Sequence, residues 1–176
     1  THGGVTEANA HPHFNAAHTI AVVHNGIVEN HEAIKSFLHE KLGDAFEGLF
    51  CSETDTEVIP HLIDYFITQE KKTFEAAFVE TGRRLEGRYA IVVMKIGEPY
   101  LLAMRDGSPL VIGKGKNEYF LASDVPAFID YTRTVCYPGD REYVKVSADA
   151  LIARNLDTAK KLDGEWLTVT WDKSSA

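Results

Sequence analysis

Residues 19–30 read TIAVVHNGIVEN, and the pattern of this stretch decides the fold prediction for the chain. Residues 19–23 are apolar and mostly β-branched or small, which predicts a short buried strand. Asn30 is of a type that often caps a helix, and apolar side chains recur after it at helical spacing as far as Leu42. Gly43 suits the end of that helix. The stretch therefore predicts a strand followed directly by an amphipathic helix.

Two more helices are expected before residue 86. Residues 54–57 fit a capping box, in which the Thr54 hydroxyl and the Glu57 carboxylate exchange hydrogen bonds with the first backbone amides. A buried stripe continues from there to Ile67, and Pro60 within it predicts a late start or a kink. A third amphipathic helix is expected over residues 73–85.

The pattern changes after Gly87. Short apolar runs are separated by turn sequences rich in Gly, Pro, Asp and Asn, which indicates strands. A short helix is expected over residues 124–131. Because helices and strands do not alternate strictly, the sequence predicts an α+β fold with largely antiparallel sheet. The expected strands are 89–94, 100–104, 110–112, 119–122, 134–137 and 142–146, with further short strands as far as Trp171.

Composition limits the functional classes. The length of 176 residues favours one domain. With 18 basic and 26 acidic residues, the net charge of −8 argues against nucleic-acid and anionic-membrane partners. No apolar run approaches the ~20 residues of a membrane span. The two cysteines, Cys51 and Cys136, are too few for a disulfide scaffold, so we expect a cytoplasmic protein.

The dipeptide Asn25-Gly26 has two interpretations. Asn-Gly is typical of a two-residue hairpin turn. However, only residues 27–29 remain before the cap at Asn30, which leaves little room for a return strand. The alternative is an oxyanion hole, in which the Asn25 side chain and the Gly26 amide donate to one developing alkoxide. Taken alone, the dipeptide favours the turn.

Asp55 lies in the acidic string SETDTE at residues 52–57. Helix capping and a favourable interaction with the helix dipole would explain Thr54 and Glu57 without any ligand. They explain less well why three carboxylates lie within six residues. The other interpretation is that Asp55 pairs with the ammonium group of a substrate.

Five of the eight histidines lie within the first 24 residues. His11, His13, His18 and His24 could be metal ligands, but their spacing matches neither a closed zinc site nor an HExxH helix. Histidines hydrogen-bonded within a polar loop are the favoured interpretation. We therefore expect neither a metal nor a cofactor.

Cys51, Cys136 and Thr1 are the candidate nucleophiles. Acidic residues follow Cys51, which disfavours a thiolate, and Cys136 lies in an apolar strand, so both cysteines are expected to be structural. An N-terminal threonine can use its own amine as a base. Thr1 could equally be an arbitrary start, so both alternatives stay open.

Several motifs occur in an order that resembles one family. The most specific are HPH at residues 11–13 and SETDTEV at residues 52–58, with HNG at residues 24–26 between them. Together they resemble the glutaminase domain of glutamine–fructose-6-phosphate aminotransferases. HNG alone would also fit amidophosphoribosyltransferases and other class II glutamine amidotransferases. The resemblance extends from residue 1 to about residue 146, through THG at 1–3, LEGRYA at 85–90, GSPLVIG at 107–113 and ASD at 122–124.

The resemblance implies an N-terminal-nucleophile hydrolase fold, an αββα sandwich of antiparallel sheets between helix layers. It implies that an N-terminal cysteine attacks the glutamine side-chain amide, that ammonia leaves, and that water then frees glutamate. Asn25 and Gly26 resemble the oxyanion hole of the family. Asp55 resembles the carboxylate that holds the substrate ammonium, and Thr1 and His2 resemble part of the glutamine pocket.

The implied partners are glutamine and the sugar-isomerase domains of a homo-oligomeric parent enzyme, where fructose 6-phosphate accepts the ammonia. The family's nucleophile opens a Cys-Gly-Ile strand upstream of the THG motif, and an Arg-Trp pair precedes that motif; neither occurs here. We therefore expect residues 1–171 to be a partial glutaminase domain that lacks its first strand or strands and is inactive alone. Residues 172–176 are expected to be a linker or cut end. The alternatives are a catalytically dead glutaminase-like binding module and a hydrolase that uses Thr1.

Overall fold

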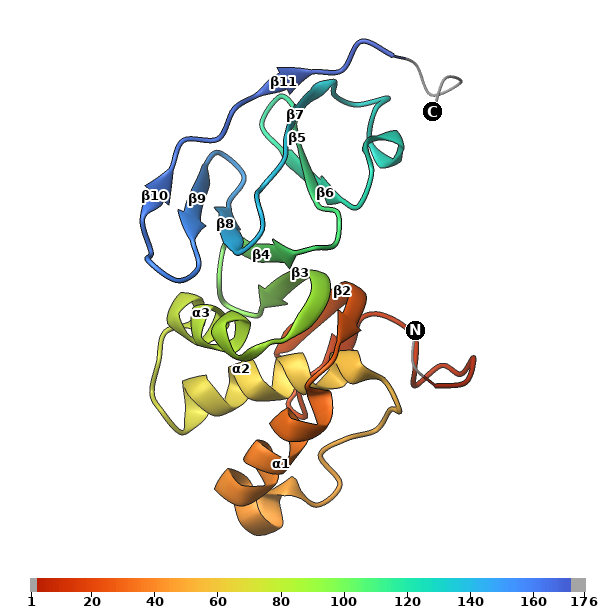
Figure 1. The fold of residues 1–176 in the computed structure, drawn as a ribbon, viewed down its shortest axis with the longest axis vertical. Helices are drawn as coiled ribbons and strands as arrows, with labels where there is room; N and C mark the ends of the chain where they lie inside the picture. Colours follow the sequence, from red (N-terminus) through yellow and green to blue (C-terminus); the bar gives the residue numbers. More distant parts are fainter. Residues whose placement is uncertain (1–2, 172–176) are drawn as a thin grey trace.

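The computed structural model describes residues 3–171 and shows an α+β fold. The α-helices all precede residue 85, and strands dominate the rest of the chain (Figure 1). Within the described residues, none of the helices has the length and apolar character needed to cross a membrane. The helices are α1 (His31–Leu42), α2 (Val58–Thr68) and α3 (Phe74–Arg84), with the 3-10 helices η1 (Gly43–Phe46), η2 (Asp55–Glu57) and η3 (Val125–Ala127).

The strands form two antiparallel sheets, as the sequence predicts. In the larger sheet the order is β1 (His13–Phe14), β2 (Ile20–Val28), β3 (Gly87–Lys95), β4 (Leu101–Asp106), β8 (Glu142–Val146), β9 (Leu151–Asn155) and β10 (Lys161–Leu162). In the smaller sheet the order is β11 (Leu167–Thr168), β7 (Thr134–Cys136), β5 (Val111–Lys114) and β6 (Tyr119–Ala122).

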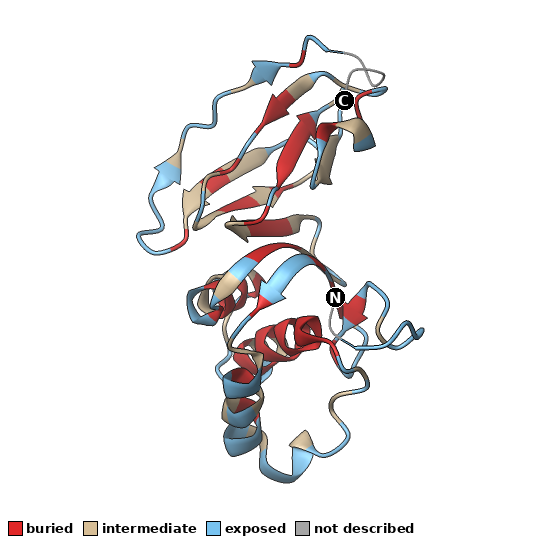
Figure 2. Ribbon diagram, turned by 45° about the vertical axis from the view of Figure 1, so that its right-hand side comes forward, coloured by how far each residue is buried: buried red, intermediate tan, exposed pale blue. Residues whose placement is uncertain are grey.

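The elements are stacked in layers, with the helices against one face of the larger sheet and the smaller sheet against the other (Figure 1). Phe66 and Phe78 anchor the helix layer in a core that also contains Ile91 and Met104 from the sheet. Figure 2 shows α2 buried along nearly its whole length, which explains its largely apolar sequence. The expected sandwich of antiparallel sheets is confirmed. Within residues 3–171, the outer face of the smaller sheet is covered by η3 and the turns around it.

The strand β2 runs through Asn25-Gly26 to Val28, so the hairpin-turn interpretation of this dipeptide is wrong. Every residue of β2 is paired with β3, including Asn25 with Ala90 and Gly26 with Tyr89. The partner of β2 thus comes from a distant part of the chain and not from residues 27–29. Burial alternates along the first half of β2, so this strand is buried on one face rather than on both.

The capping box expected at residues 54–57 is also wrong. The Thr54 hydroxyl makes no cap hydrogen bond and contacts Nε2 of His13 at 3.2 Å. The Glu57 carboxylate accepts hydrogen bonds from the amides of Cys51 and Ser52, each at 2.8 Å. The chain before η2 therefore wraps around Glu57, and Thr54 is used in a contact between distant segments.

Asn30 precedes α1 but makes no side-chain cap hydrogen bond. Its side-chain amide donates to the Arg84 carbonyl at 2.7 Å, and its side-chain oxygen accepts from the Glu86 amide at 3.0 Å. It joins the start of α1 to the end of α3, so tertiary bonds replace the local one. The predicted end of the first helix is confirmed, since Gly43 follows α1 with a φ of 55°. The third helix begins as expected, and the structure shows that Thr73 caps α3 by accepting from the Ala76 amide.

The late start of the second helix is confirmed as well. η2 comes first, and Pro60 lies in the opening turn of α2, where its missing amide hydrogen removes no helix bond. The short helix expected over residues 124–131 is reduced to the single turn of η3, with Asp124 accepting from the Val125 amide at 2.7 Å.

Candidate active site

A pocket of about 170 Å³ lies between η2 and the edge of β2. Among residues 3–171, β1 pairs with β2 only at Ala21 and Val22, and no other described strand lies along the following residues on this edge. η2 lies beside them instead and brings Asp55 and Thr56 to the pocket, and Thr54, which directly precedes η2, also lines it. The lining residues are Asn9, His11, His24, Asn25, Gly26, Thr54, Asp55 and Thr56.

Gly26 has a backbone conformation that side-chain-bearing residues rarely adopt. Its φ is +116°, although it lies within a paired strand. A β-carbon here would overlap the carbonyl oxygen of Arg88 and would lie 2.7 Å from Oγ of Ser108. Gly87, on the facing strand, has a φ of +117° and a similarly close approach to the carbonyl of Ile27. Glycine is therefore required both at residue 26 on β2 and at residue 87 on β3, where the two backbones lie close together.

Backbone amides along β2 point alternately to its two edges. Val28 donates to Asp55 on the pocket edge at 2.6 Å, whereas Glu29 donates to the Glu86 carbonyl on the β3 side at 2.8 Å. Gly26 lies two residues before Val28, so the alternation directs its amide to the pocket edge. Asn25 lines this pocket and also a neighbouring pocket that Ala90 and Leu110 line. Asn25 and Gly26, the residues predicted to form an oxyanion hole, thus border one pocket.

Asp55 is the buried carboxylate of the pocket. Only 3% of the residue is exposed, and its Oδ2 accepts the hydrogen bond from Val28. Asp55 faces the donors of β2 across a small space, so a ligand between them would meet a negative charge on one side and hydrogen-bond donors on the other. The other two predicted binding residues, Thr1 and His2, lie outside the described residues.

His24 joins the site from the helix-facing side of β2. Its Nδ1 lies 2.8 Å from Oγ1 of Thr56, and its buried Nε2 has no hydrogen-bond partner among the described residues. Burial lowers the pKa of His24 to about 4, although the nearby Asp55 carboxylate opposes the shift. His24 is therefore neutral near pH 7. Burial also lowers the pKa of His11.

Sequence reasoning treated His24 as a loop histidine and did not single out Thr56 or Asn9. His24 could have been recognised as a strand residue if the strand had been continued through Gly26. No local sequence pattern marks Asn9, because its side chain acts in contacts between loops. Its side-chain oxygen accepts from the backbone amide of Glu53 at 3.0 Å, and its side-chain NH₂ group donates to the Gly4 carbonyl at 2.8 Å.

Neither cysteine lines this pocket. Cys51 is exposed and borders another pocket of about 380 Å³, together with Glu57 and His61. Cys136 is buried in β7, and burial raises the pKa of its thiol. Among residues 3–171 no three His, Cys, Asp or Glu side chains are grouped as a metal site. Within the described part of the chain, the pocket of Asn25, Gly26 and Asp55 is thus lined by no cysteine.

Residues 4–130 match the family described as "Glutamine amidotransferase domain". The matched span contains every residue of the pocket. The chain belongs to the glutamine amidotransferase domain family. The α+β fold class was expected from the sequence. The family match confirms the resemblance that the sequence motifs indicated.

This glutamine amidotransferase domain is similar to the N-terminal part of longer curated proteins. It is 41% identical over 177 residues to glutamine–fructose-6-phosphate aminotransferase (isomerizing) of Clostridium perfringens, covering all of the chain and 28% of that protein. It is 47% identical over 151 residues to the enzyme of the same name from Methanothermobacter thermautotrophicus, covering 85% of the chain and 24% of that protein. The chain thus spans less than a third of the length of these relatives.

Two solved structures share the fold. One is described as the allosteric regulatory enzyme of purine biosynthesis, with a TM-score of 0.70, 24% identity, and coverage of 89% of this chain and 33% of that chain. The other is the glutamine phosphoribosylpyrophosphate amidotransferase of B. subtilis, with a TM-score of 0.64, 24% identity, and coverage of 79% and 29%. At this identity the likeness concerns the fold of the domain.

Proposed function

We propose that this domain hydrolyses the side-chain amide of glutamine within a larger enzyme, which transfers the ammonia to fructose 6-phosphate and forms glucosamine 6-phosphate. The observation that carries the proposal is the single pocket shared by Asn25 and Gly26 on β2 and Asp55 on η2. The similarity to glutamine–fructose-6-phosphate aminotransferases at 41% and 47% identity supports fructose 6-phosphate as the acceptor over the phosphoribosylpyrophosphate in the name of the B. subtilis structural relative, which is 24% identical.

The chemistry follows from the two sides of the pocket. Attack on the side-chain amide carbonyl of glutamine places negative charge on the carbonyl oxygen. The Asn25 side chain and the Gly26 amide donate to that oxygen and stabilise the charge. The Asp55 carboxylate accepts charge-assisted hydrogen bonds from the α-ammonium group at the other end of the substrate. Thr1 and His2 are proposed to complete the glutamine pocket.

We assign the attacking thiol to neither Cys51 nor Cys136, since neither lines the pocket. The nucleophile, in this proposal, is the N-terminal cysteine that the family resemblance implies, and these 176 residues contain no cysteine in that role. Residues 1–171 then form a partial glutaminase domain that is inactive alone. The sugar-isomerase domains, a homo-oligomeric assembly and a cytoplasmic location belong to the proposed parent enzyme.

Replacement of Asn25 tests the oxyanion role in the parent enzyme. We expect Asn25→Ala to lower kcat for glutamine hydrolysis by roughly 10²-fold or more, with a smaller change in KM, because the lost bond acts on the transition state. Asn30→Ala is the matched control, since Asn30 makes structural hydrogen bonds just beyond the C-terminal end of the same strand and does not line the pocket. It should lower the thermal midpoint and leave kcat nearly unchanged. Equal kcat losses in both variants, or none in Asn25→Ala, would contradict the proposal.

A further inference from the structure

The loop Asp106-Gly107-Ser108, which begins at the last residue of β4, lies directly against the backbone of Gly26. Ser108 is buried, and its Oγ lies 2.7 Å from the place where a β-carbon on Gly26 would be. The loop is therefore in contact with the strand at the residue whose amide faces the pocket. Gly26 has a φ of +116°, which a glycine adopts without a steric penalty, so the contacts around it select among conformations that are open to it.

Two side chains hold the middle of this loop by its backbone. The amide of Gly107 donates to Oδ1 of Asp140 at 2.8 Å, and the carbonyl of Gly107 accepts from Nη2 of Arg88 at 2.9 Å. The same Oδ1 of Asp140 lies 2.7 Å from Nη2 of Arg105, which fixes the carboxylate. Gly107 itself has a φ of +70°, so the loop departs from the strand geometry on either side. Asp140 comes from the turn before β8, far along the chain.

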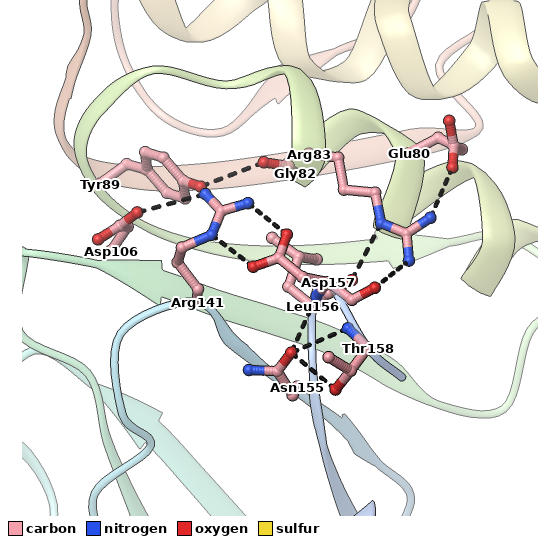
Figure 3. Close-up of polar contacts among 10 residues, drawn as sticks. All are labelled: Glu80, Gly82, Arg83, Tyr89, Asp106, Arg141, Asn155, Leu156, Asp157 and Thr158. Atoms are coloured by element: carbon pink, nitrogen blue, oxygen red, sulfur yellow. Dashed lines mark hydrogen bonds and ion pairs between the residues drawn. The ribbon is translucent and has the colours of Figure 1, made fainter. Parts of the chain in front are cut away.

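A neighbouring ion-pair network contains Asp157, an aspartate that can be compared with Asp140 (Figure 3). Asp157 binds the guanidinium of Arg141 through two hydrogen bonds, at 2.8 and 2.6 Å, and Arg141 lies 3.6 Å from a carboxylate oxygen of Asp106. This network reaches the side chain of Asp106 but no backbone group of Gly107. Asp140 and Asp157 are thus two half-exposed aspartates, each paired with an arginine, of which only Asp140 holds the loop backbone.

We propose that Asp140 is a positioning residue for the amide of Gly26. It fixes the backbone of Gly107, which keeps Ser108 against Gly26 and so holds the backbone of Gly26 with its amide toward the pocket. The structural part of the inference is independent of the reaction. Its catalytic consequence rests on the proposed oxyanion role of Gly26.

Amide NMR tests the structural part on the chain itself. Asn25-Gly26 is the single Asn-Gly step in the sequence, so ¹³C-carbonyl asparagine with ¹⁵N-glycine labelling reports one signal, that of the Gly26 amide. We expect Asp140→Ala to move this signal by more than its linewidth. Asp140→Asn keeps an acceptor for the Gly107 amide and should move it less, and Asp157→Ala should leave it in place. An unmoved signal in Asp140→Ala, or an equal movement in Asp157→Ala, overturns the inference.

If Asp140→Ala does not fold, Arg88→Met decides, because it removes the other hydrogen bond to Gly107, and an unmoved Gly26 signal then overturns the inference. In the parent enzyme, Asp140→Ala should lower kcat for glutamine hydrolysis about 10-fold and change KM by less than about 2-fold, since a misplaced oxyanion donor costs less than a missing one. A moved NMR signal with unchanged kcat would contradict the oxyanion role of Gly26 and would leave the positioning by Asp140 standing.

Discussion

The carboxylate of Asp55 accepts a 2.6 Å hydrogen bond from the backbone amide of Val28. This bond joins η2 to β2 two residues beyond Gly26, so it sets the width of the pocket. Asp55 is therefore a structural residue of the strand edge and a lining residue of the pocket at once. Its two roles separate in experiments, because an amide can replace a carboxylate as an acceptor but carries no charge.

We expect Asp55→Asn to lower kcat/KM for glutamine by roughly 10- to 150-fold in the parent enzyme, the equivalent of the ~1.5–3 kcal/mol of a hydrogen bond to a charged group. Stability should fall by no more than about 1 kcal/mol, since the Asn oxygen can still accept from Val28. Activity with free ammonia should be spared. The measurements are glutamine kinetics and the thermal midpoint, with Asp64→Asn on α2 as the control. A lower midpoint with unchanged glutamine kinetics would show that Asp55 serves the fold alone.

Gly26→Ala should destabilise the chain by about 2 kcal/mol or more. The substitution combines a φ of +116° with an overlap of the new β-carbon and the Arg88 carbonyl, and each is unfavourable by itself. Gly4→Ala is the control, because a β-carbon there has nothing within 4 Å. Urea unfolding of both variants measures the difference. Similar midpoints for Gly26→Ala and the unmodified chain would show that the backbones of β2 and β3 can move apart to accommodate the new β-carbon.

The stability of the chain should depend on pH through His24. Its pKa is lowered from 6.5 to about 4 in the folded state, so between these values the unfolded chain binds more protons. Stability is therefore highest above about pH 6.5 and falls as the pH drops to about 4, by up to about 3 kcal/mol. His24→Gln should flatten this part of the profile measured by urea unfolding, whereas His39→Gln, on the exposed end of α1, should not. A profile unchanged by His24→Gln would contradict the assignment.

The two cysteines should be dispensable. The 176-residue chain is expected to release no glutamate from glutamine above background, because Cys51 and Cys136 lie away from the pocket of Asn25 and Asp55. In the parent enzyme, Cys51→Ala should leave glutamine kcat within about 2-fold of the original value, as expected for a surface thiol. Glutaminase turnover by the isolated chain that disappears in Cys51→Ala would instead make Cys51 the nucleophile.

Local sequence patterns predicted most of the helices and strands. In these elements the spacing of buried side chains and the local backbone preferences favour the same structure. β6 and β8 were predicted at residues 119–122 and 142–146, the bounds that the structure shows. The errors share one cause. Asn30, Thr54 and Asn25 are polar residues with a favourable local role in a cap or a turn, and in the folded chain each is used in contacts with a distant segment.

The order of helices and strands was determined by the sequence alone, through apolar spacing and glycine and proline signals that act over a few residues. So was the family, because its motifs are short contiguous strings. Only the tertiary structure decided that Asn25-Gly26 lies within a strand, that Asp55 bonds Val28, and that Asp140 holds Gly107 beside Gly26. These bonds join segments far apart in the chain. A buried hydrogen-bond donor requires an acceptor. Which distant group becomes that acceptor depends on how the sheets and helices pack.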